Sequence, residues 1–129
     1  MADINEKLNE LNNTADTTNE FDPQDIQNNK AMAILAYLSW LVLIPLFAAK
    51  DSKFARFHVN QGLVLAIGEL IVLTIIGILT RIPFIGWIFG ILESLAGLVF
   101  FILLIVGILN AANGKAKELP IVGKYRILK

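Results

Sequence analysis

Three long stretches with almost no charge dominate this sequence and restrict what it can fold into. Residues 31–49 carry no charged side chain, residues 61–80 carry only Glu69, and residues 82–109 carry only Glu93. A run of about 18 or more apolar residues is typical of a transmembrane helix, because about 20 residues at ~1.5 Å each cross a ~30 Å hydrocarbon layer. A soluble helical bundle would need a polar face on each helix, which these stretches lack. We therefore predict an all-α integral membrane protein.

The stretches predict a membrane domain over residues 23–110 with three transmembrane helices, at about 31–49, 58–80 and 86–109. The third stretch begins irregularly with Pro83, and proline disrupts a helix interior. Two short crossings over residues 82–109 are therefore an alternative, which would give four crossings in all. Asp22, followed by Pro23, predicts the start of a helix ahead of the first crossing, because these residue types suit the cap and the first turn.

The two ends of the chain differ in charge. Residues 1–22 are rich in acids and poor in aromatic residues, and we expect a disordered tail there. Residues 111–129 form a basic tail, which we expect to bind anionic lipid at about 1 kcal/mol per base rather than nucleic acid. Its bases are Lys115, Lys117, Lys124, Arg126 and Lys129.

The bases also predict an orientation in the membrane. Short loops that face the cytoplasm carry an excess of lysine and arginine. With three crossings, the loop near Lys50 and the basic tail lie on one side, and they hold most of the bases. The expected protein is a multi-pass protein of the cell membrane with a cytoplasmic C-terminus and an N-terminus outside.

The residue types leave little room for catalysis. The chain has no cysteine and one histidine, which excludes disulfides, thiol catalysis and thiolate metal sites. No nucleotide fingerprint, phosphate loop or nucleophile elbow is present. We expect no catalytic residue, no metal, no cofactor and no enzymatic activity. An intramembrane enzyme acting on lipid is the weakest of the functions we consider.

Two carboxyl groups lie inside the apolar stretches. Glu69 precedes Arg81 by twelve residues and Glu93 follows it by twelve, so a hairpin that turns near Arg81 would hold both at similar depth. A carboxylate in hydrocarbon is costly, about 2.5–3.5 kcal/mol for aspartate on insertion scales, so such residues are functional candidates. They could hydrogen-bond across a helix interface in the neutral form, line a path for protons or cations, or face a water-filled vestibule.

Small residues lie at helical spacing beside both carboxyl groups. Such residues let helix backbones approach closely in a membrane, so we expect these faces to contact other helices. The predicted packing residues are Gly62, Ala66 and Gly77 on the second helix, and Gly86, Gly90 and Gly97 on the third.

A polar stretch, "KDSKFARFHVNQ", separates the first and second apolar stretches. Asp51 or Ser52 can cap a helix that starts near Lys53. We predict that its first turns lie at the membrane surface as an interfacial docking element, with His58 either bonding at the headgroup level or responding to pH. The residues of this motif are Lys50, Asp51, Ser52, Phe54, Arg56, Phe57, His58 and Gln61.

Three segments, "NKAMAILAYLSWL", "KDSKFARFHVNQGL" and "GKAKELPIVGKY", carry a resemblance to a widespread bacterial family of small membrane proteins of unknown function. That family is similar to the Tic-twenty component of the chloroplast inner-envelope import apparatus and to the magnetosome protein MamF. The resemblance covers about residues 28–127 and implies a multi-helix membrane protein. The chloroplast relatives imply a part in a protein-conducting channel, and the magnetosome relatives imply a part in membrane organisation or assembly.

Two functions follow from these observations. The first is a non-enzymatic scaffold or accessory subunit that oligomerises, or binds other membrane proteins, through the small-residue faces. The second is a channel or protein-translocation component in which Glu69 and Glu93 line a polar path within an oligomer, because three helices are too few to enclose a wide pore.

Overall fold

The computed structural model describes residue 6 and residues 14–128, and its regular secondary structure there is entirely helical. This confirms the predicted all-α class. An isolated antiparallel bridge joins Asp16 to Lys117. The helices are η1 (Thr18–Glu20), α2 (Pro23–Asn28), α3 (Lys30–Leu35), η2 (Ser39–Val42), α4 (Leu43–Ala48), α5 (Lys53–Leu79) and α6 (Gly86–Ala112).

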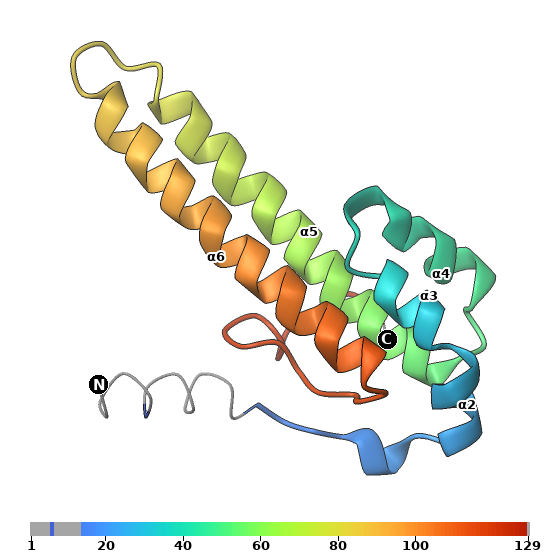
Figure 1. Cartoon of the computed structure of the whole chain (residues 1–129). Coiled ribbons are helices and arrows are strands. Elements are labelled where there is room, and N and C mark those ends of the chain that lie inside the picture. The colour runs from blue at the N-terminus through green and yellow to red at the C-terminus, as the bar shows by residue number, and fades with distance from the viewer. Residues whose placement is uncertain (1–5, 7–13, 129) are drawn as a thin grey trace.

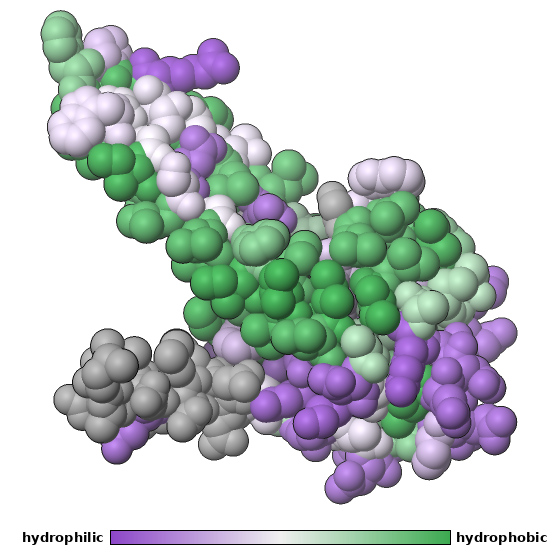
Figure 2. Space-filling model, viewed as in Figure 1, coloured by the Kyte–Doolittle hydropathy of each residue, from purple (hydrophilic) through white to green (hydrophobic). Residues whose placement is uncertain are grey.

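Helices α5 and α6 form a long antiparallel hairpin that projects from a wider base (Figure 1). Each has 27 residues, or about 40 Å at ~1.5 Å per residue. Both are long and apolar enough to cross a membrane, with a mean hydropathy of 2.6 in the most apolar part. Large apolar side chains such as Leu70 and Leu95 are exposed along their length, and Figure 2 shows an apolar surface over the hairpin. These two helices coincide with the second and third predicted crossings.

The first predicted crossing is not confirmed, because residues 31–49 do not form one helix. Helix α3 ends at Leu35, the chain turns, and η2 and α4 then run beside α3 and α5. Pro45 lies within α4. It has no N–H to donate and its ring collides with the carbonyl four residues earlier, so a regular helix cannot continue through residue 41.

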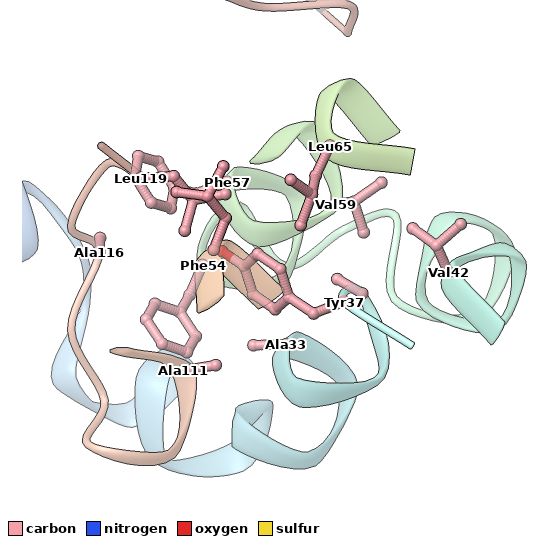
Figure 3. Packing of buried hydrophobic residues seen from close by; sticks show 12 residues of the cluster. Ala33, Tyr37, Val42, Phe54, Phe57, Val59, Leu65, Ala111, Ala116 and Leu119 are labelled. Atoms are coloured by element: carbon pink, nitrogen blue, oxygen red, sulfur yellow. The ribbon is translucent and has the colours of Figure 1, made fainter. Parts of the chain in front are cut away.

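The hydrophobic core lies in the base. Figure 3 shows Phe54, Phe57 and Val59 of α5 packed with Ala33 and Tyr37, and the cluster also includes Leu119 of the C-terminal segment. Buried residues of α5 are confined to its first half, between Phe54 and Leu65. The helix therefore has a base half covered by protein and a tip half whose apolar side chains need lipid.

The two ends of the chain lie side by side at the base. The Thr17 N–H donates to the Ala116 carbonyl at 3.0 Å, and the Glu118 N–H donates to the Ala15 carbonyl at 2.9 Å. Of the disordered tail predicted over residues 1–22, the part from residue 14 onward is thus ordered, and most of the remainder lies outside the described residues. Three crossings would put these paired segments on opposite sides of a membrane.

Candidate functional site

One carboxylate joins the two ends of the segment that contains the first apolar stretch. Asp22 caps α2 by accepting from the Gln24 N–H, with Pro23 in the first turn as predicted, and this aims Asp25 at the start of α5. Asp25 accepts from the Ser52 hydroxyl at 2.5 Å and from the Phe54 N–H at 3.0 Å. Ser52, rather than Asp51, caps α5 by accepting from the Ala55 N–H. We call the group formed by Asp25, Ser52 and the Phe54 N–H the Asp25 clamp.

The electrostatics of the clamp favour the charged form of Asp25. Partial burial raises the pKa of this carboxyl, but hydrogen bonds from Ser52, the Phe54 N–H and Asn29 outweigh burial, and the pKa is lowered from its ordinary value of 3.8. Asn29 contributes its side-chain amide at 2.8 Å. The clamp is therefore formed by an ionised carboxylate at neutral pH.

His58 is fully buried and joins three segments of the base. Its Nε2 lies 2.8 Å from the Lys115 carbonyl oxygen and its Nδ1 lies 2.5 Å from the Tyr37 hydroxyl. A carbonyl can only accept, so Nε2 carries the proton and Nδ1 accepts from Tyr37. The rings of Phe54 and Phe57 pack edge-on against the imidazole, with centroids 4.9 and 5.1 Å away. A neutral histidine fits this enclosed position.

The end of α6 presents the carbonyl that His58 binds. Gly114 adopts a φ of 70° just past the helix, a conformation that glycine tolerates without strain. The Lys115 N–H then donates to the Asn110 carbonyl at 2.8 Å and the Gly114 N–H to the Ala111 carbonyl at 3.1 Å, which is a Schellman termination. This turn directs the C-terminal segment back across the start of α5.

Two further polar side chains of α5 hold that segment. Gln61 is buried, donates to the Gly123 carbonyl and accepts from the Leu119 N–H, each at 2.9 Å. Asn60 accepts from the N–H groups of Ile127 and Leu128. We call His58, Asn60 and Gln61, with the backbone groups they bind, the tail clasp.

The motif predicted to dock at the membrane surface has both exposed and buried residues. Lys50 and Asp51 are exposed and Arg56 is half-buried. Ser52, Phe54, Phe57, His58 and Gln61 are buried. The buried members do not form the expected docking surface, because their partners lie within the protein. His58 and Gln61 bind the C-terminal segment, whereas Ser52 binds Asp25 of α2. Sequence could not show this, since the partner segment lies about 60 residues further along.

One base of the basic tail contacts other residues of the protein. Arg126 pairs with Glu118 at 2.8 Å and its guanidinium lies 5.4 Å from the centre of the Phe57 ring. Lys115 and Lys124 are exposed and Lys117 is half-buried, while Lys129 lies outside the described residues. Lipid binding by these bases remains a prediction.

The two membrane carboxyls do not lie at the same depth. A methyl group added at Gly77 would lie 3.2 Å from Oε1 of Glu93, and one added at Gly68 would lie 3.9 Å from the Phe100 ring. Glu93 therefore faces α5 about eight residues, or roughly 12 Å, above Glu69. The expected symmetric pair fails because the loop between the helices spans residues 80–85, so the chain turns later than Arg81.

The predicted packing glycines fall into two groups. Added methyl groups at Gly62 and Gly86 would lie 1.8 and 2.0 Å from the carbonyl oxygens of Ala36 and Thr80, so both glycines contact their own chain closely. Among the described residues, no atom lies within 4 Å of such a methyl at Gly90 or Gly97. Ala66, with Glu69, lines a shallow groove on α5.

Sequence reasoning missed Tyr37, Asn60 and Gly107. Tyr37 packs on Gly107, where an added methyl would lie 2.3 Å from the ring. The available signal was a tyrosine inside an apolar stretch, because a buried hydroxyl needs a partner and His58 was a candidate. Gly107 gave no signal of its own, since it follows the same pattern as other glycines of α6.

Comparison with known proteins assigns the family. The sequence model of a family described as "Magnetosome magnetite crystal formation protein family" matches residues 28–127, which include both hairpin helices and the three side chains of the tail clasp. The chain belongs to the MamF/MmsF family. The magnetosome part of the sequence resemblance is thereby confirmed, and these matches do not extend to the chloroplast import component.

Three relatives of this MamF/MmsF chain come from two organisms. The magnetosome protein MmsF of Paramagnetospirillum magneticum is 36% identical over 92 residues, covering 70% of this chain and 78% of that protein. The magnetosome protein MamF of the same organism is 34% identical over 95 residues, covering 73% and 78%. The UPF0132 membrane protein MJ1443 of Methanocaldococcus jannaschii is 41% identical over 91 residues, covering 69% and 76%. No solved structure matches this chain significantly.

Proposed function

We propose that this MamF/MmsF family member is a non-enzymatic membrane scaffold that self-associates through α6 while its base lies at the membrane surface. The observation that carries the proposal is the contrast among its glycines. Gly62 and Gly107 accommodate contacts within the chain, whereas Gly90 and Gly97 face open space. Within the part of the chain that the structure describes, this close-packing surface on α6 is thus left without a partner.

Glycine inside a helix has a cost that a packing role offsets. A mid-helix glycine destabilises a helix by about 0.8–1 kcal/mol relative to alanine. In a membrane, small residues offset this by letting helices approach closely, where dispersion and weak hydrogen bonds act between backbones. Ser94, which lies between Gly90 and Gly97, donates to the Gly90 carbonyl of its own helix and so adds little bulk to this face.

The relatives suggest where such a scaffold acts. Two of them are named as magnetosome proteins and a third only as a membrane protein. By this kinship we infer that the assembly organises a specialised membrane region of the magnetosome kind. The expected contribution is membrane architecture, because the polar side chains of the tail clasp are all engaged inside the base.

The charges support a cytoplasmic base. Eight of the nine lysines and arginines among the described residues belong to the base or its adjoining loop, and Arg81 lies at the hairpin tip. Figure 2 shows the hydrophilic residues gathered at the base end. The positive-inside rule then places the base in the cytoplasm, where Lys115, Lys117 and Lys124 can meet anionic headgroups.

The test of self-association is Gly90→Leu, measured by the oligomer size in lipid nanodiscs or by single-molecule photobleaching in liposomes. A leucine at this position separates two helices that approach at Gly90, so we expect a shift to monomers. The control is Leu95→Phe, which adds bulk at an exposed position on a different face of the same helix. Equal assembly size for wild type and Gly90→Leu would rule out this face as the contact.

A second candidate, a channel or translocation component, rests on the two carboxyls. Glu69 opens onto the groove lined by Ala66, Leu70, Leu73 and Thr74 of α5. In an oligomer this groove would form part of a polar path. This function predicts ion flux in liposomes that Glu69→Gln alters. Flux equal to that of empty liposomes, under conditions that preserve the oligomer, would exclude it.

A further inference from the structure

We propose that residues 30–49 form a re-entrant hairpin that enters only the leaflet on the base side and returns to the side from which it started. Helix α3 leads inward, η2 lies at the far end, and α4 leads back (Figure 1). The partner of its exposed surface is the acyl-chain region of that leaflet. This inference concerns topology and lipid contact, so it stands apart from self-association through α6.

The first argument is that both ends of the segment are held together. Asp25, just before α3, binds the Ser52 hydroxyl and the Phe54 N–H, just after α4, at 2.5 and 3.0 Å. A transmembrane crossing between these residues would separate them by about 30 Å of hydrocarbon. A carboxylate that bridges the two ends therefore requires the segment to begin and end on one side.

The second argument is that protein covers the non-helical turn that follows α3. Non-helical backbone at membrane depth is tolerated only where protein or water covers it. Ala36 and Tyr37 are 1% and 2% exposed. The Ala36 carbonyl rests against Gly62 of α5, and the Tyr37 ring rests against Gly107 of α6. The two long helices thus supply the cover that lipid cannot give to this turn.

The third argument is the character of the surface that remains open. Trp40 is 72% exposed and Phe47 is 71% exposed, with Leu43 and Ile44 about half exposed between them. Figure 2 shows the apolar surface of the hairpin continuing onto the adjoining part of the base, above its hydrophilic end. Because this surface is continuous with the lipid-facing hairpin, the same hydrocarbon layer covers both.

The length of the segment limits its depth. Helices α3 and α4 have six residues each, or about 9 Å at ~1.5 Å per residue. A single leaflet provides about 15 Å of the ~30 Å core. The segment therefore reaches into one leaflet without crossing it, and the N-terminal segment lies on the same side as the C-terminal one, as the Asp16–Lys117 bridge requires. This replaces the expectation of an N-terminus outside.

The test uses single cysteines, which is direct because the chain has none of its own. Asn28→Cys and Asp51→Cys flank the segment at exposed positions, and Arg81→Cys marks the hairpin tip. In sealed vesicles of one orientation, a membrane-impermeant maleimide should label positions 28 and 51 from the same side and position 81 from the other. Labelling of 28 and 51 from opposite sides would establish a full crossing and overturn the proposal.

A second measurement tests the lipid partner. The chain has two tryptophans, so Trp40 is the sole fluorophore of that kind in Trp87→Phe. In vesicles that contain phospholipids with a doxyl group on the acyl chain, we expect strong quenching of Trp40. Absence of quenching, with cysteine labelling unchanged, would mean that another protein covers this surface and would overturn the lipid assignment. Neither result depends on the oligomer size of Gly90→Leu.

Discussion

At the scale of single residues, Gln61 determines whether the C-terminal segment stays on the base. Its side-chain amide satisfies one buried donor, the Leu119 N–H, and one acceptor, the Gly123 carbonyl. The Gly123 carbonyl also accepts from Arg126. Leu119 is 1% exposed, so its N–H has no ready access to water if Gln61 is replaced.

Gln61→Leu should release the C-terminal segment. The substitution puts an apolar side chain of similar size in place of the polar amide. It therefore leaves the Leu119 N–H unpaired, at a cost of about 1–3 kcal/mol. Hydrogen–deuterium exchange should show faster exchange over residues 119–128, with α6 unchanged. Lys124→Gln, at an exposed position of the same segment, serves as the control and should exchange like the wild type. Unchanged protection in Gln61→Leu would refute this role.

The Asp25 clamp should weaken in acid. The pKa of Asp25 is lower in the folded protein than its ordinary value of 3.8, so the clamp contributes stability above that value and loses it as pH falls through the folded-state pKa. Between pH 6 and pH 2.5, proteolysis within residues 49–52 should increase at the acidic end. Asp25→Asn should be cleaved readily at all of these pH values.

Asp51→Asn provides the matched control for that experiment. Asp51 is exposed in the same loop and takes no part in the clamp among the described residues. This variant should keep the acid dependence of the wild type. Identical pH profiles for the wild type and Asp25→Asn would show that another group controls the loop.

The residues of the polar motif could be selected from sequence, but their role could not. A stretch with one histidine, two phenylalanines and a glutamine between apolar runs indicated a special position. The burial of His58 and Gln61 depends on residues 115–128, and the left-handed turn at Gly114 directs that segment back over α5. Periodicity within the motif carries no information about that distant segment.

At the scale of elements, α6 has one end fixed against the base, and its middle packs against α5. Gly107 contacts Tyr37, which is itself held by His58. A methyl added at Gly97, in contrast, would have no atom of residues 14–128 within 4 Å. The same substitution at the two positions should therefore have opposite effects on the stability of the monomer.

Gly107→Ala should destabilise the monomer by about 1–3 kcal/mol, because the new methyl overlaps a ring that cannot move without breaking its hydrogen bond. Gly97→Ala should be neutral or stabilising by up to about 1 kcal/mol, owing to the higher helix propensity of alanine. Unfolding of the monomers by denaturing detergent, followed by circular dichroism, measures both. Equal effects would show that Tyr37 does not pack on α6 as described.

The long helices were predictable because their signal is local. The long apolar stretches 61–80 and 82–109, each with a single charged residue, are sufficient to predict α5 and α6. The stretch 31–49 is just as apolar, yet it breaks into α3, η2 and α4. The deciding factors are tertiary: Asp25 binding Ser52, and the fit of Ala36 against Gly62. Hydropathy alone cannot distinguish a crossing from a segment that turns back.

At the scale of the whole molecule, the predicted number of crossings decides on which side of the membrane the N-terminus is expected. The excess of bases predicted a cytoplasmic loop and C-terminal tail, and the structure keeps these at one end. The predicted placement of the N-terminus depended on an odd number of crossings. The pairing of residues 14–18 with the C-terminal segment at the base favours an even number.

The molecule is wider at the base than at the tip of the hairpin. At the base, α2, α3, η2 and α4 surround the start of α5, whereas toward the tip only α5 and α6 remain (Figure 1). With residues 30–49 in the leaflet on the base side, as proposed above, the protein would occupy more area in that leaflet than in the other. Many copies inserted in the same orientation would then act as wedges, and a membrane would relieve the mismatch in area by bulging toward the base side.

A wedge of this shape should bind preferentially to curved membranes, and binding to vesicles of different size can detect that preference. When it is reconstituted with its base outward, its density per unit of lipid should be higher in small vesicles than in large ones. Paired substitution of Trp40 and Phe47 by serine should reduce that preference, because it removes the apolar side chains that hold the wedge in the leaflet. A scaffold built from such units would set the radius of the compartment it encloses.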